Sequence, residues 1–303
     1  MAESKKRFLI TGVTGQVGGA LVSRLQDQDV IAADRSVIDL ARPDTIASVL
    51  DRLNPSIIVN PAAYTAVDQA ESERNVVALV NATAPGAIAR WAAARGVPLV
   101  HFSTDYVFDG SGDKPWREDD ATHPLSVYGN TKLDGERAVR AAGGASLIVR
   151  TSWVYSAGGK NFLRTIARLA REREQLRIVA DQIGAPTSAA LIAGTVKIML
   201  GGDIEIFRSR CAQCSGIVHL AARGETSWHG FARAIVDGLQ KRAVHVAVKE
   251  VIPIKTEEYP TPAKRPHNSR LDLTRLARVF GITPAHWRDA LDVELDALAV
   301  ELR

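Results

Sequence analysis

The chain has 303 residues, of which 46% are hydrophobic, and it carries a formal net charge of +4 at pH 7. That length allows one large domain or two unequal ones. The basic residues are scattered, which excludes a nucleic-acid surface but suits an anionic small substrate. No apolar run reaches the roughly 18 residues of a membrane helix, and the charged start is unlike a signal peptide, so we expect a cytoplasmic protein without membrane contact.

The first predicted unit is a strand, a glycine turn and a helix. An apolar strand, Arg7–Thr11, leads into Gly12, Gly15 and Gly18, and apolar residues then follow at helical spacing. The glycines are spaced three and three, whereas the commoner fingerprint spaces them two and three. Glycine lets the backbone turn tightly and approach a pyrophosphate, which lies on the N-terminus of the helix. We therefore predict a dinucleotide-binding turn.

The second strand, Val30–Asp34, ends on an acid roughly 20 residues past the first glycine. The Asp34 carboxylate can accept hydrogen bonds from the adenosine ribose hydroxyls, which favours NAD. Arg35 can instead pair with a 2′-phosphate, which favours NADP. Asp39 and Leu40 follow and are candidates to flank the adenine. The alternative is that both acids only end a strand and cap a turn.

A third strand, Ser56–Asn60, follows a helix that we expect to start at an Asp44 cap and to reach Leu53. Small residues in the next loop, Pro61–Asp68, allow a ligand to lie against the backbone. Three acids come at the end of this loop, and we interpret them as helix N-terminal residues favoured by the dipole rather than as metal ligands. They are Asp68, Glu71 and Glu73. A long helical stretch then leads to the central strand, Pro98–Ser103.

A tyrosine and a lysine stand near the start of the predicted helix Val127–Ala142, beyond an irregular loop rich in Gly, Asp and Pro. Residues four apart lie on one helix face, so Tyr128 and Lys132 point the same way. A free phenol has a pKa of about 10, and a nearby ammonium lowers it. Tyr128 can then donate a proton to a developing alkoxide, while the Thr104 hydroxyl helps to hold that oxygen. The alternative is an ordinary surface helix face.

Strand and helix alternate five times up to the strand Ala145–Arg150, which predicts a parallel sheet with helices on both faces. Ligands bind such sheets at the carboxyl ends of the strands. The candidate residues fall at those ends: Gly12, Asp34, Ala62, Thr104 and Trp153. We predict an α/β fold, with a Rossmann-type doubly wound parallel sheet in residues 1–152. A strand and helix near 188–222 return to it, and residues 153–303 mainly form a smaller C-terminal α/β substrate domain.

Beyond residue 153 the alternation loosens. We expect helices over Phe162–Glu174, Ser188–Leu200 and Trp228–Leu239, strands over Leu176–Ala180, Gly216–Leu220 and Val244–Ile254, and two short closing helices. The only cysteines, Cys211 and Cys214, lie in a polar segment and fit a reducing cytoplasm. A single CxxC pair is not expected to bind metal or to serve redox chemistry. Lys264 and Arg265, in a proline-rich run, are candidates to contact a diphosphate.

Seven segments together resemble the dTDP-4-dehydrorhamnose reductases, a family of extended short-chain dehydrogenases/reductases. They are Thr11–Gly18, Ala62–Asp68, Ser103–Phe108, Tyr128–Lys132, Arg150–Tyr155, Asp181–Thr187 and Arg265–Leu271. The glycine turn and the Tyr-x-x-x-Lys pair mark only the superfamily, whereas the Ser-Thr-Asp-Tyr-Val-Phe and Arg-Thr-Ser-Trp-Val-Tyr segments are much more specific. The resemblance covers nearly the whole chain.

The resemblance implies reduction of the 4-keto group of dTDP-6-deoxy-L-lyxo-4-hexulose by NADPH, or by NADH, as the last step of dTDP-L-rhamnose synthesis. Tyr128 matches the proton donor, Lys132 the residue that tunes it and holds the nicotinamide ribose, and Thr104 the residue that polarises the keto oxygen. The implied cofactor site comprises Gly12, Gly15, Gln16, Val17, Gly18, Asp34, Arg35, Asp39, Leu40, Ala62, Ala63, Tyr64, Thr65, Tyr128 and Lys132. The implied substrate site comprises Ser103, Thr104, Asp105, Tyr106, Trp153, Asn161, Gln182 and Arg265.

One departure from the family concerns a metal. Some members form a dimer around Mg²⁺ held by glutamates, one of them just after the Pro-Thr segment, where this chain has Ala189 and Ala190. A methyl group cannot ligate a hard cation, so a magnesium-bridged dimer is doubtful and no metal site is predicted, while a homodimer stays open. Two alternatives remain. One is another nucleotide-sugar reductase or epimerase of the same fold, with Trp153 and the Asp181–Thr187 loop as discriminators. The other is a non-catalytic regulatory subunit resembling that of methionine adenosyltransferase.

Overall fold

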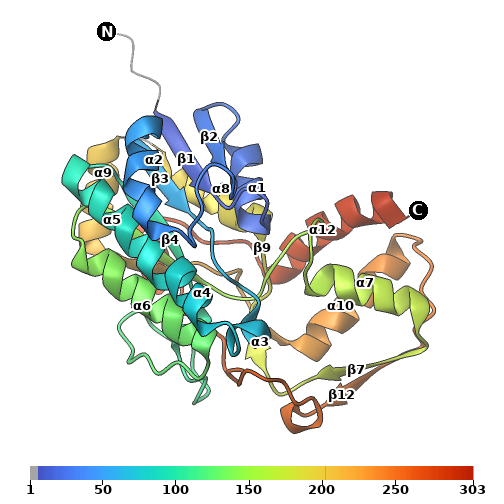
Figure 1. Cartoon of the computed structure of the whole chain (residues 1–303). Coiled ribbons are helices and arrows are strands. Elements are labelled where there is room, and N and C mark those ends of the chain that lie inside the picture. The colour runs from blue at the N-terminus through green and yellow to red at the C-terminus, as the bar shows by residue number, and fades with distance from the viewer. Residues whose placement is uncertain (1–5, 202, 303) are drawn as a thin grey trace.

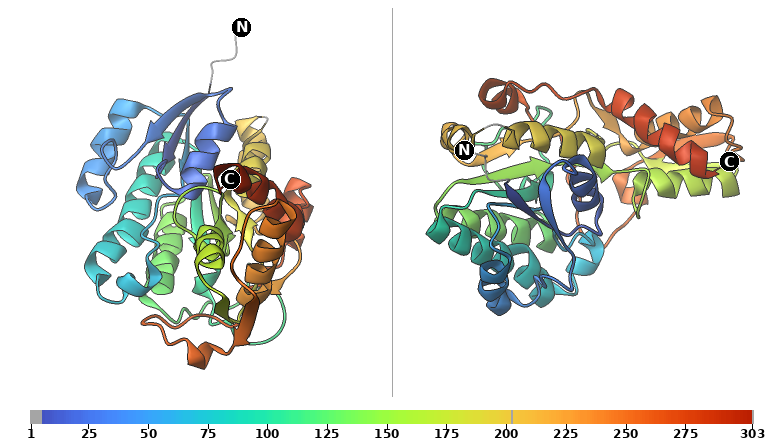
Figure 2. Two further views of the ribbon diagram at one scale, coloured as in Figure 1. Left: turned by 90° about the vertical axis from the view of Figure 1, so that its right-hand side faces the viewer. Right: turned by 90° about the horizontal axis from the view of Figure 1, so that it is seen from above.

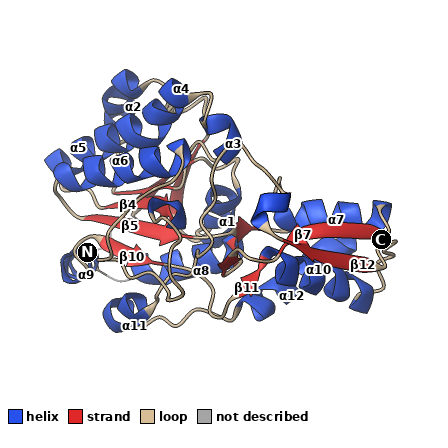
Figure 3. Cartoon of the chain, turned by 90° about the horizontal axis from the view of Figure 1, so that it is seen from below, coloured by secondary structure: helices blue, strands red, loops and turns tan. Residues whose placement is uncertain are grey.

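The fold is built on a six-stranded parallel sheet (Figures 1 and 3). A computed structural model describes residues 6–201 and 203–302 of the chain. The strand order is β10-β5-β4-β3-β1-β2, and every neighbouring pair is parallel. The strands are β1 (Arg7–Thr11), β2 (Asp29–Ala33), β3 (Ile57–Asn60), β4 (Leu99–Thr104), β5 (Ser146–Thr151) and β10 (Ile217–His219). The predicted Rossmann-type parallel sheet is confirmed.

Helices cover both faces of this sheet (Figures 1 and 2). One face packs against α1 (Gln16–Arg24), α8 (Ala189–Leu200), α9 (Ile204–Gln213) and α11 (Thr274–Phe280), and the other against α2 (Ile46–Leu53), α5 (Ala84–Arg95) and α6 (Val127–Ala141). β3 and β4 are buried along their whole length, as strands covered on both faces should be. The strand order reverses between β1 and β3, so their carboxyl ends open onto the crevice where such sheets bind ligands.

A smaller unit stands beside this sheet (Figures 1 and 3). It contains α7 (Phe162–Glu172), α10 (Trp228–Lys241), α12 (Trp287–Leu302) and the parallel pair β7 (Gln175–Val179) and β12 (Glu250–Ile254). Its core is aromatic, because Phe231 contacts the rings of Tyr155, Phe162 and Trp287. The short strands β6 (Val154–Tyr155) and β9 (Thr187–Ser188) pair, as do β8 (Ile183–Gly184) and β11 (Thr226–Ser227). Although they come late in the chain, β10 is a strand of the large sheet and α8 packs against that sheet. The domain boundary at residue 152 stays a prediction.

The chain between β3 and β4 is helical and contains an irregular turn. α3 (Val67–Ala70) comes first, and a π-helical turn, Leu79–Thr83, joins α4 (Arg74–Ala78) to α5. By length and composition the continuous stretch Arg74–Arg95 could cross a membrane, but half of its most apolar window is buried in the protein. Buried core helices also reach this length and apolar composition, so the stretch is only weak evidence for a membrane span.

Two predicted elements begin at least two residues later in the structure. Pro43–Thr45 forms a 3₁₀ turn and α2 begins only at Ile46, so Asp44 does not cap it. The predicted strand Val244–Ile254 shortens to β12. The reason is that the amides of residues 247 to 249 bond to carbonyls of residues 170 and 174, at and just beyond the end of α7, rather than to β7.

Two segments are more helical than predicted. The polar segment around the cysteines is largely α9, which turns Cys211 into the core of the sheet, where Cys214 is also buried. Burial raises the pKa of the Cys211 thiol to about 12, so it stays protonated and unreactive at neutral pH. The closing helix α12 has 16 residues rather than being short, because Leu291, Leu295 and Leu298 form a buried stripe against the small core.

Candidate active site

The glycine turn between β1 and α1 brings open backbone to the carboxyl edge of the sheet. Gly12 has a φ of +59°, and a Cβ there would lie 2.8 Å from Ala62 Cα. A Cβ on Gly18 would lie 2.3 Å from the Gly12 carbonyl oxygen. Gly15 is the N-cap of α1 and has no side chain with which to cap it, so the free N–H groups of the first turn can receive an anion. The turn therefore fits the pyrophosphate of a dinucleotide.

A loop of the smaller unit reaches this turn through the Gln16 side chain. Gln16 Oε1 accepts hydrogen bonds from Ser156 Oγ at 3.0 Å and from Asn161 Nδ2 at 2.9 Å. Asn161 Nδ2 also donates to the carbonyls of Ser156 and Gly158, and its Oδ1 caps α7 by accepting from Arg164 N. Both polar atoms of Asn161 are thus engaged within the protein. Asn161 therefore links the two parts of the chain, and its role in substrate binding stays a prediction.

The acid that follows β2 is held by its own turn. Asp34 Oδ1 accepts hydrogen bonds from the Ser36 hydroxyl at 2.6 Å and from Ser36 N at 2.9 Å, and these bonds lower the pKa of Asp34. Arg35 is exposed and pairs with Asp39. The Leu40 side chain is buried in the core, so only its backbone can face an adenine. This strand end presents an ionised carboxylate and an exposed guanidinium, which suit ribose hydroxyls and a 2′-phosphate respectively.

A residue that the sequence did not single out organises the loop after β3. Asn81 lies fully buried in the π-helical turn, and its side chain accepts from Tyr64 N at 2.8 Å and donates to Tyr64 O at 3.1 Å. It also donates to Thr131 Oγ1 on α6 at 3.3 Å. The loop that contains Ala63 and Thr65 is thereby fixed to α6. The only signal in the sequence was an asparagine within an apolar helical run, because a π turn leaves no pattern of its own.

We expect Asn81→Leu to weaken binding of a nicotinamide dinucleotide by about tenfold or more. The substitution leaves the partly buried N–H and C=O of Tyr64 without their partners in Asn81, and each such group costs up to about 1–3 kcal/mol. Fluorescence titration with NADPH measures the affinity, and thermal denaturation measures the accompanying loss of stability. Asn75→Ala, at an exposed position on α4, is the matched control and should change neither. Unchanged affinity in a destabilised Asn81→Leu protein would mean that Asn81 serves only the fold.

The carboxyl end of β4 carries a row of polar side chains. Thr104 Oγ1 accepts from Tyr106 N at 3.2 Å, which caps the 3₁₀ turn η3 (Asp105–Val107), and donates to Asp105 Oδ1 at 3.1 Å. Asp105 is buried, and this burial raises its pKa to about 6. Ser103 Oγ and Asp105 Oδ2 are buried and find no partner among the described residues. Buried polar atoms of this kind are exceptional and point to a ligand or water site.

α6 brings Tyr128 and Lys132 to the same edge of the sheet. A Cβ on Gly129 would lie 2.3 Å from the Tyr106 carbonyl oxygen, so glycine lets α6 approach η3 closely. The Tyr128 side chain lies beside that of Thr104, close enough for the two hydroxyls to interact. Lys132 is buried, and its Nζ donates to the Phe102 carbonyl at 2.6 Å. The three predicted catalytic residues therefore meet at the end of β4.

The predicted acidification of the phenol is wrong for this structure. Burial raises the pKa of Tyr128 above its usual value, and the nearby Thr104 side chain opposes that shift only partly. Burial also lowers the pKa of Lys132 to about 8, against the opposing effect of Glu136. The physical reason is that the Lys132 ammonium is turned to the Phe102 carbonyl rather than to the phenol. A phenol that keeps its proton throughout the neutral range is still suited to donate one.

Two predicted substrate residues lie where the smaller unit meets the sheet. Trp153 has a φ of +48°, stacks on Trp228 with ring centroids 3.6 Å apart, and leaves no room for a Cβ on Gly184. Non-glycine residues whose backbone is held in the left-handed region cluster at functional sites. Gln182 is buried and donates to Thr256 Oγ1 in the 3₁₀ turn η4 (Thr256–Glu258) at 3.2 Å. The Gln182 amide therefore holds the loop after β7 against the turn after β12.

The three acids after β3 hold neighbouring segments. Asp68 lies in the first turn of α3 and pairs with Arg265. Glu71 Oε1 accepts from the first amide of α6 at 2.8 Å, and Glu73 Oε2 accepts from the Tyr64 hydroxyl at 2.9 Å. The predicted position at a helix N-terminus holds for all three: Asp68 lies in the first turn of α3, Glu73 is the N-cap residue of α4, and Glu71 binds the N-terminus of α6. Among the described residues, no group of three or more His, Cys, Asp or Glu could hold a metal ion.

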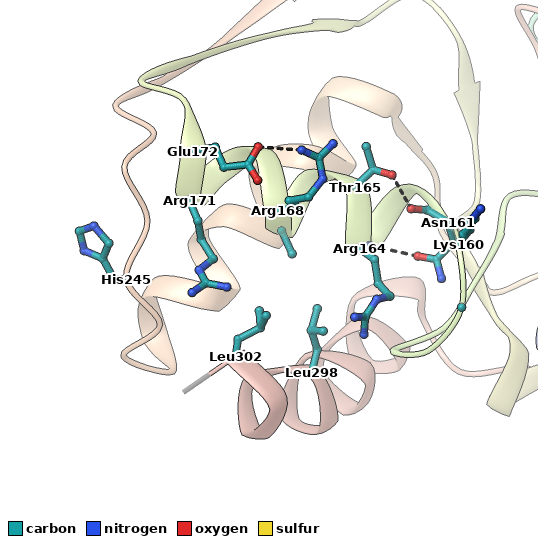
Figure 4. Close-up of a pocket in the computed structure, with 12 residues that line it drawn as sticks. Lys160, Asn161, Arg164, Thr165, Arg168, Arg171, Glu172, His245, Leu298 and Leu302 are labelled. Carbon is teal, nitrogen blue, oxygen red and sulfur yellow. Dashed lines mark hydrogen bonds and ion pairs between the residues drawn. The ribbon is translucent and has the colours of Figure 1, made fainter.

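A basic pocket of about 740 Å³ lies between α7 and α12 (Figure 4). Lys160, Arg164, Arg168 and Arg171 line it, and Arg168 is paired with Glu172. Its lining contains none of the residues that meet at the end of β4, so the pocket is separate from the candidate catalytic residues.

Comparison with known proteins decides the family. The family model described as the RmlD substrate binding domain matches residues 6–300. A dTDP-4-dehydrorhamnose reductase from Burkholderia thailandensis is 46% identical, over 94% of this chain and 96% of its own length. The chain belongs to the dTDP-4-dehydrorhamnose reductase family. The reductase of this family from Escherichia coli K12 is 42% identical, over 93% of this chain and 94% of its own.

Solved structures of dTDP-4-dehydrorhamnose reductases share the whole fold. The crystal structure of the Bacillus anthracis reductase in complex with NADP has a TM-score of 0.86 and 32% identity, covering 97% of this chain and 99% of its own. The resemblance seen in the sequence is therefore confirmed, and the chain is an NAD(P)-binding reductase. A more distant structure, MoeE5 in complex with UDP-glucose and NAD, shares only the fold, at 18% identity and a TM-score of 0.76.

Proposed function

We propose that the chain reduces the 4-keto group of dTDP-6-deoxy-L-lyxo-4-hexulose to give dTDP-L-rhamnose, with NADPH as the reductant. One observation carries the proposal: the Tyr128 side chain lies beside that of Thr104 at the carboxyl end of β4. Lys132 stands one helical turn further along α6, and the glycine turn lies at the same edge of the sheet. Two hydroxyls that converge on one point can both bind a single substrate oxygen.

The chemistry then divides between cofactor and chain. Bound NADPH supplies a hydride to the keto carbon. As the C=O electron pair moves onto oxygen, Tyr128 gives its hydroxyl proton to that oxygen, and the Thr104 hydroxyl stabilises the developing charge with a hydrogen bond. The remaining phenolate regains a proton from solvent, so each turnover consumes one proton. The Lys132 ammonium, which donates to the Phe102 carbonyl in this structure, would hold the nicotinamide ribose.

The preference for NADPH rests on the end of β2. The exposed Arg35 can pair with a 2′-phosphate, while the ionised Asp34 can receive ribose hydroxyls. The Bacillus anthracis relative was crystallised in complex with NADP, which supports the same choice. Gly12, Gly15 and Gly18 would hold the pyrophosphate against the N-terminus of α1.

The decisive test follows the absorbance of NADPH or NADH while the protein is supplied with the dTDP-4-keto sugar made enzymatically from dTDP-glucose. Oxidation that depends on this sugar supports the proposal, and greater activity with UDP-sugars would favour another reductase or epimerase of the fold. Absence of oxidation, together with recovery of a partner synthetase in a pull-down, would favour a regulatory subunit.

The setting that we propose is a cytoplasmic enzyme that acts on a small dTDP-sugar, without nucleic acid or a membrane. A homodimer, if it forms, would lack a magnesium bridge at the start of α8. Ala189 and Ala190 stand there, and their methyl groups offer a cation no ligand.

We expect the affinity for NADPH to fall as the pH rises through about 8, by up to tenfold per pH unit. Burial lowers the pKa of Lys132 to about 8, so its ammonium is charged below that pH and neutral above it. A charged Lys132 can hold the nicotinamide ribose, whereas a neutral amine holds it less well. Fluorescence titrations from neutral to alkaline pH measure the effect. Tyr128→Phe should keep this pH dependence and Lys132→Met should lose it. The reverse result would assign the titration to the phenol.

A further inference from the structure

A single carboxylate after β3 ties the smaller unit to the catalytic edge of the sheet. Asp68 Oδ2 pairs with Arg265 Nη2 at 2.6 Å, and Asp68 Oδ1 accepts a hydrogen bond from Ala263 N at 3.3 Å. The two partners lie close together in the proline-rich run that precedes α11. The pair joins residues 197 positions apart in the chain. Both oxygens of one carboxylate therefore fasten this run beside the loop after β3.

The guanidinium held by Asp68 leads directly to the catalytic phenol. Arg265 Nη1 donates to the Tyr106 hydroxyl at 3.2 Å. The Tyr106 ring stands edge-on to the Tyr128 ring, with centroids 5.5 Å apart. Asp68, Arg265, Tyr106 and Tyr128 thus form a continuous row of contacts at the mouth of the candidate site.

Arg265 keeps donors for a ligand in this arrangement. A guanidinium has five N–H donors in a rigid fork, and the contacts to Asp68 and Tyr106 use one on each terminal nitrogen. The Arg265 side chain is 25% exposed and that of Asp68 is 41% exposed, so the pair is open to a ligand. A pair this exposed contributes little to stability. Its more distinctive effect is to fix the direction in which the fork points.

We propose that Asp68 is a positioning residue for the substrate diphosphate: it aims the Arg265 guanidinium so that its remaining N–H groups bind the two phosphates next to Tyr128. The inference rests on the proposed function, because it supplies the contact that a dTDP-sugar needs beyond its keto group. Fork-shaped pairing of a guanidinium with phosphate oxygens depends on orientation, so a guanidinium that has lost its support binds less well even though its charge is unchanged.

The test measures dTDP binding by calorimetry and steady-state kinetics with the dTDP-4-keto sugar. Asp68→Ala should raise the Kd for dTDP and the KM for the sugar about tenfold, while kcat and the Kd for NADPH change less than about threefold. Asp29→Ala is the matched control. Asp29 also pairs with an arginine, its side chain is 42% exposed, and it lies at the opposite end of β2 from the site. It should leave all four constants unchanged.

A double variant separates positioning from a general effect of charge. If Asp68 acts through Arg265, adding Asp68→Ala to Arg265→Ala should weaken dTDP binding no further than Arg265→Ala alone. Multiplying effects in the double variant would overturn the inference, and so would tighter dTDP binding by Asp68→Asn, which would show that the carboxylate merely repels phosphate.

The two proposals can fail separately. If the wild-type protein binds dTDP but does not oxidise NADPH with the keto sugar, the proposed function fails, while the dTDP affinities of the variants still test Asp68. If the wild-type protein does not bind dTDP, the inference about Asp68 is overturned. Hydrogen exchange supplies a readout without ligand: Asp68→Ala should speed exchange of the Ala263 amide, which loses its acceptor.

Discussion

Tyr128→Phe is expected to lower kcat by about 10²–10⁴-fold, because the substitution removes the proton donor and keeps the aromatic ring. The ring should stay in place, since it packs edge-on against Tyr106 and its helix is capped by Ser126, whose Oγ accepts from Gly129 N at 3.1 Å. Affinity for NADPH should therefore stay within about threefold of the wild type. Single-turnover rates with the dTDP-4-keto sugar, measured beside the cofactor affinity, test both parts.

Thr104→Val is the comparison for that experiment. It removes the hydroxyl that meets the phenol but leaves the proton donor, so its loss of rate should be smaller than that of Tyr128→Phe. Full activity of Tyr128→Phe would remove Tyr128 from the chemistry. An equal loss in affinity for the cofactor would instead make Tyr128 a binding residue.

Glu136→Leu is expected to lower the free energy of unfolding by about 3–5 kcal/mol, the usual cost of leaving one partner of a buried ion pair uncompensated. Glu136 lies four residues beyond Lys132 on α6, and its carboxylate takes two bonds from Arg150, at 2.8 Å and 2.6 Å. The two side chains are 2% and 3% exposed. Urea denaturation at constant m-value measures the loss.

The double variant Glu136→Leu/Arg150→Met should recover most of that stability, because apolar side chains of similar size can replace a buried pair. Asp134→Ala provides the control on the same helix. Its pair with Arg137 is exposed on both sides, so the loss should stay below about 1 kcal/mol. A cost for Glu136→Leu as small as that of the control would show that the buried pair does not support α6.

Local pattern was enough to predict the sheet and the position of Tyr128 and Lys132 on one helix face. Each of these patterns, whether the glycine turn, a buried strand or the spacing of Tyr128 and Lys132, spans only a few residues. The rule that parallel sheets bind ligands at the carboxyl ends of their strands then places the patterns together. The glycine between Tyr128 and Lys132 fits this arrangement, because a larger residue at position 129 would prevent the close approach of α6 to η3.

What could not be predicted depends on partners far away in the chain. Glu73 is the N-cap residue of α4, as predicted, but its bond from the Tyr64 hydroxyl could not be foreseen. Asn161 was implied to be a substrate residue, and nothing in the sequence indicated that three acceptors and one donor of the protein would engage its amide. Lys132 was placed on the correct face, but the direction of its ammonium depends on the Phe102 carbonyl. Such outcomes follow from side-chain geometry that spacing does not encode.

The π-helical turn at Leu79–Thr83 has a consequence for how the chain tolerates changes of length. A turn of this kind holds one residue more than a regular helix, and each residue rotates a helix by about 100°. Deleting one residue there would restore the regular repeat and swing the buried amide of Asn81 away from the peptide that it clamps. Deletion of a single residue would thus release the loop after β3, although it changes none of the groups proposed to contact a ligand.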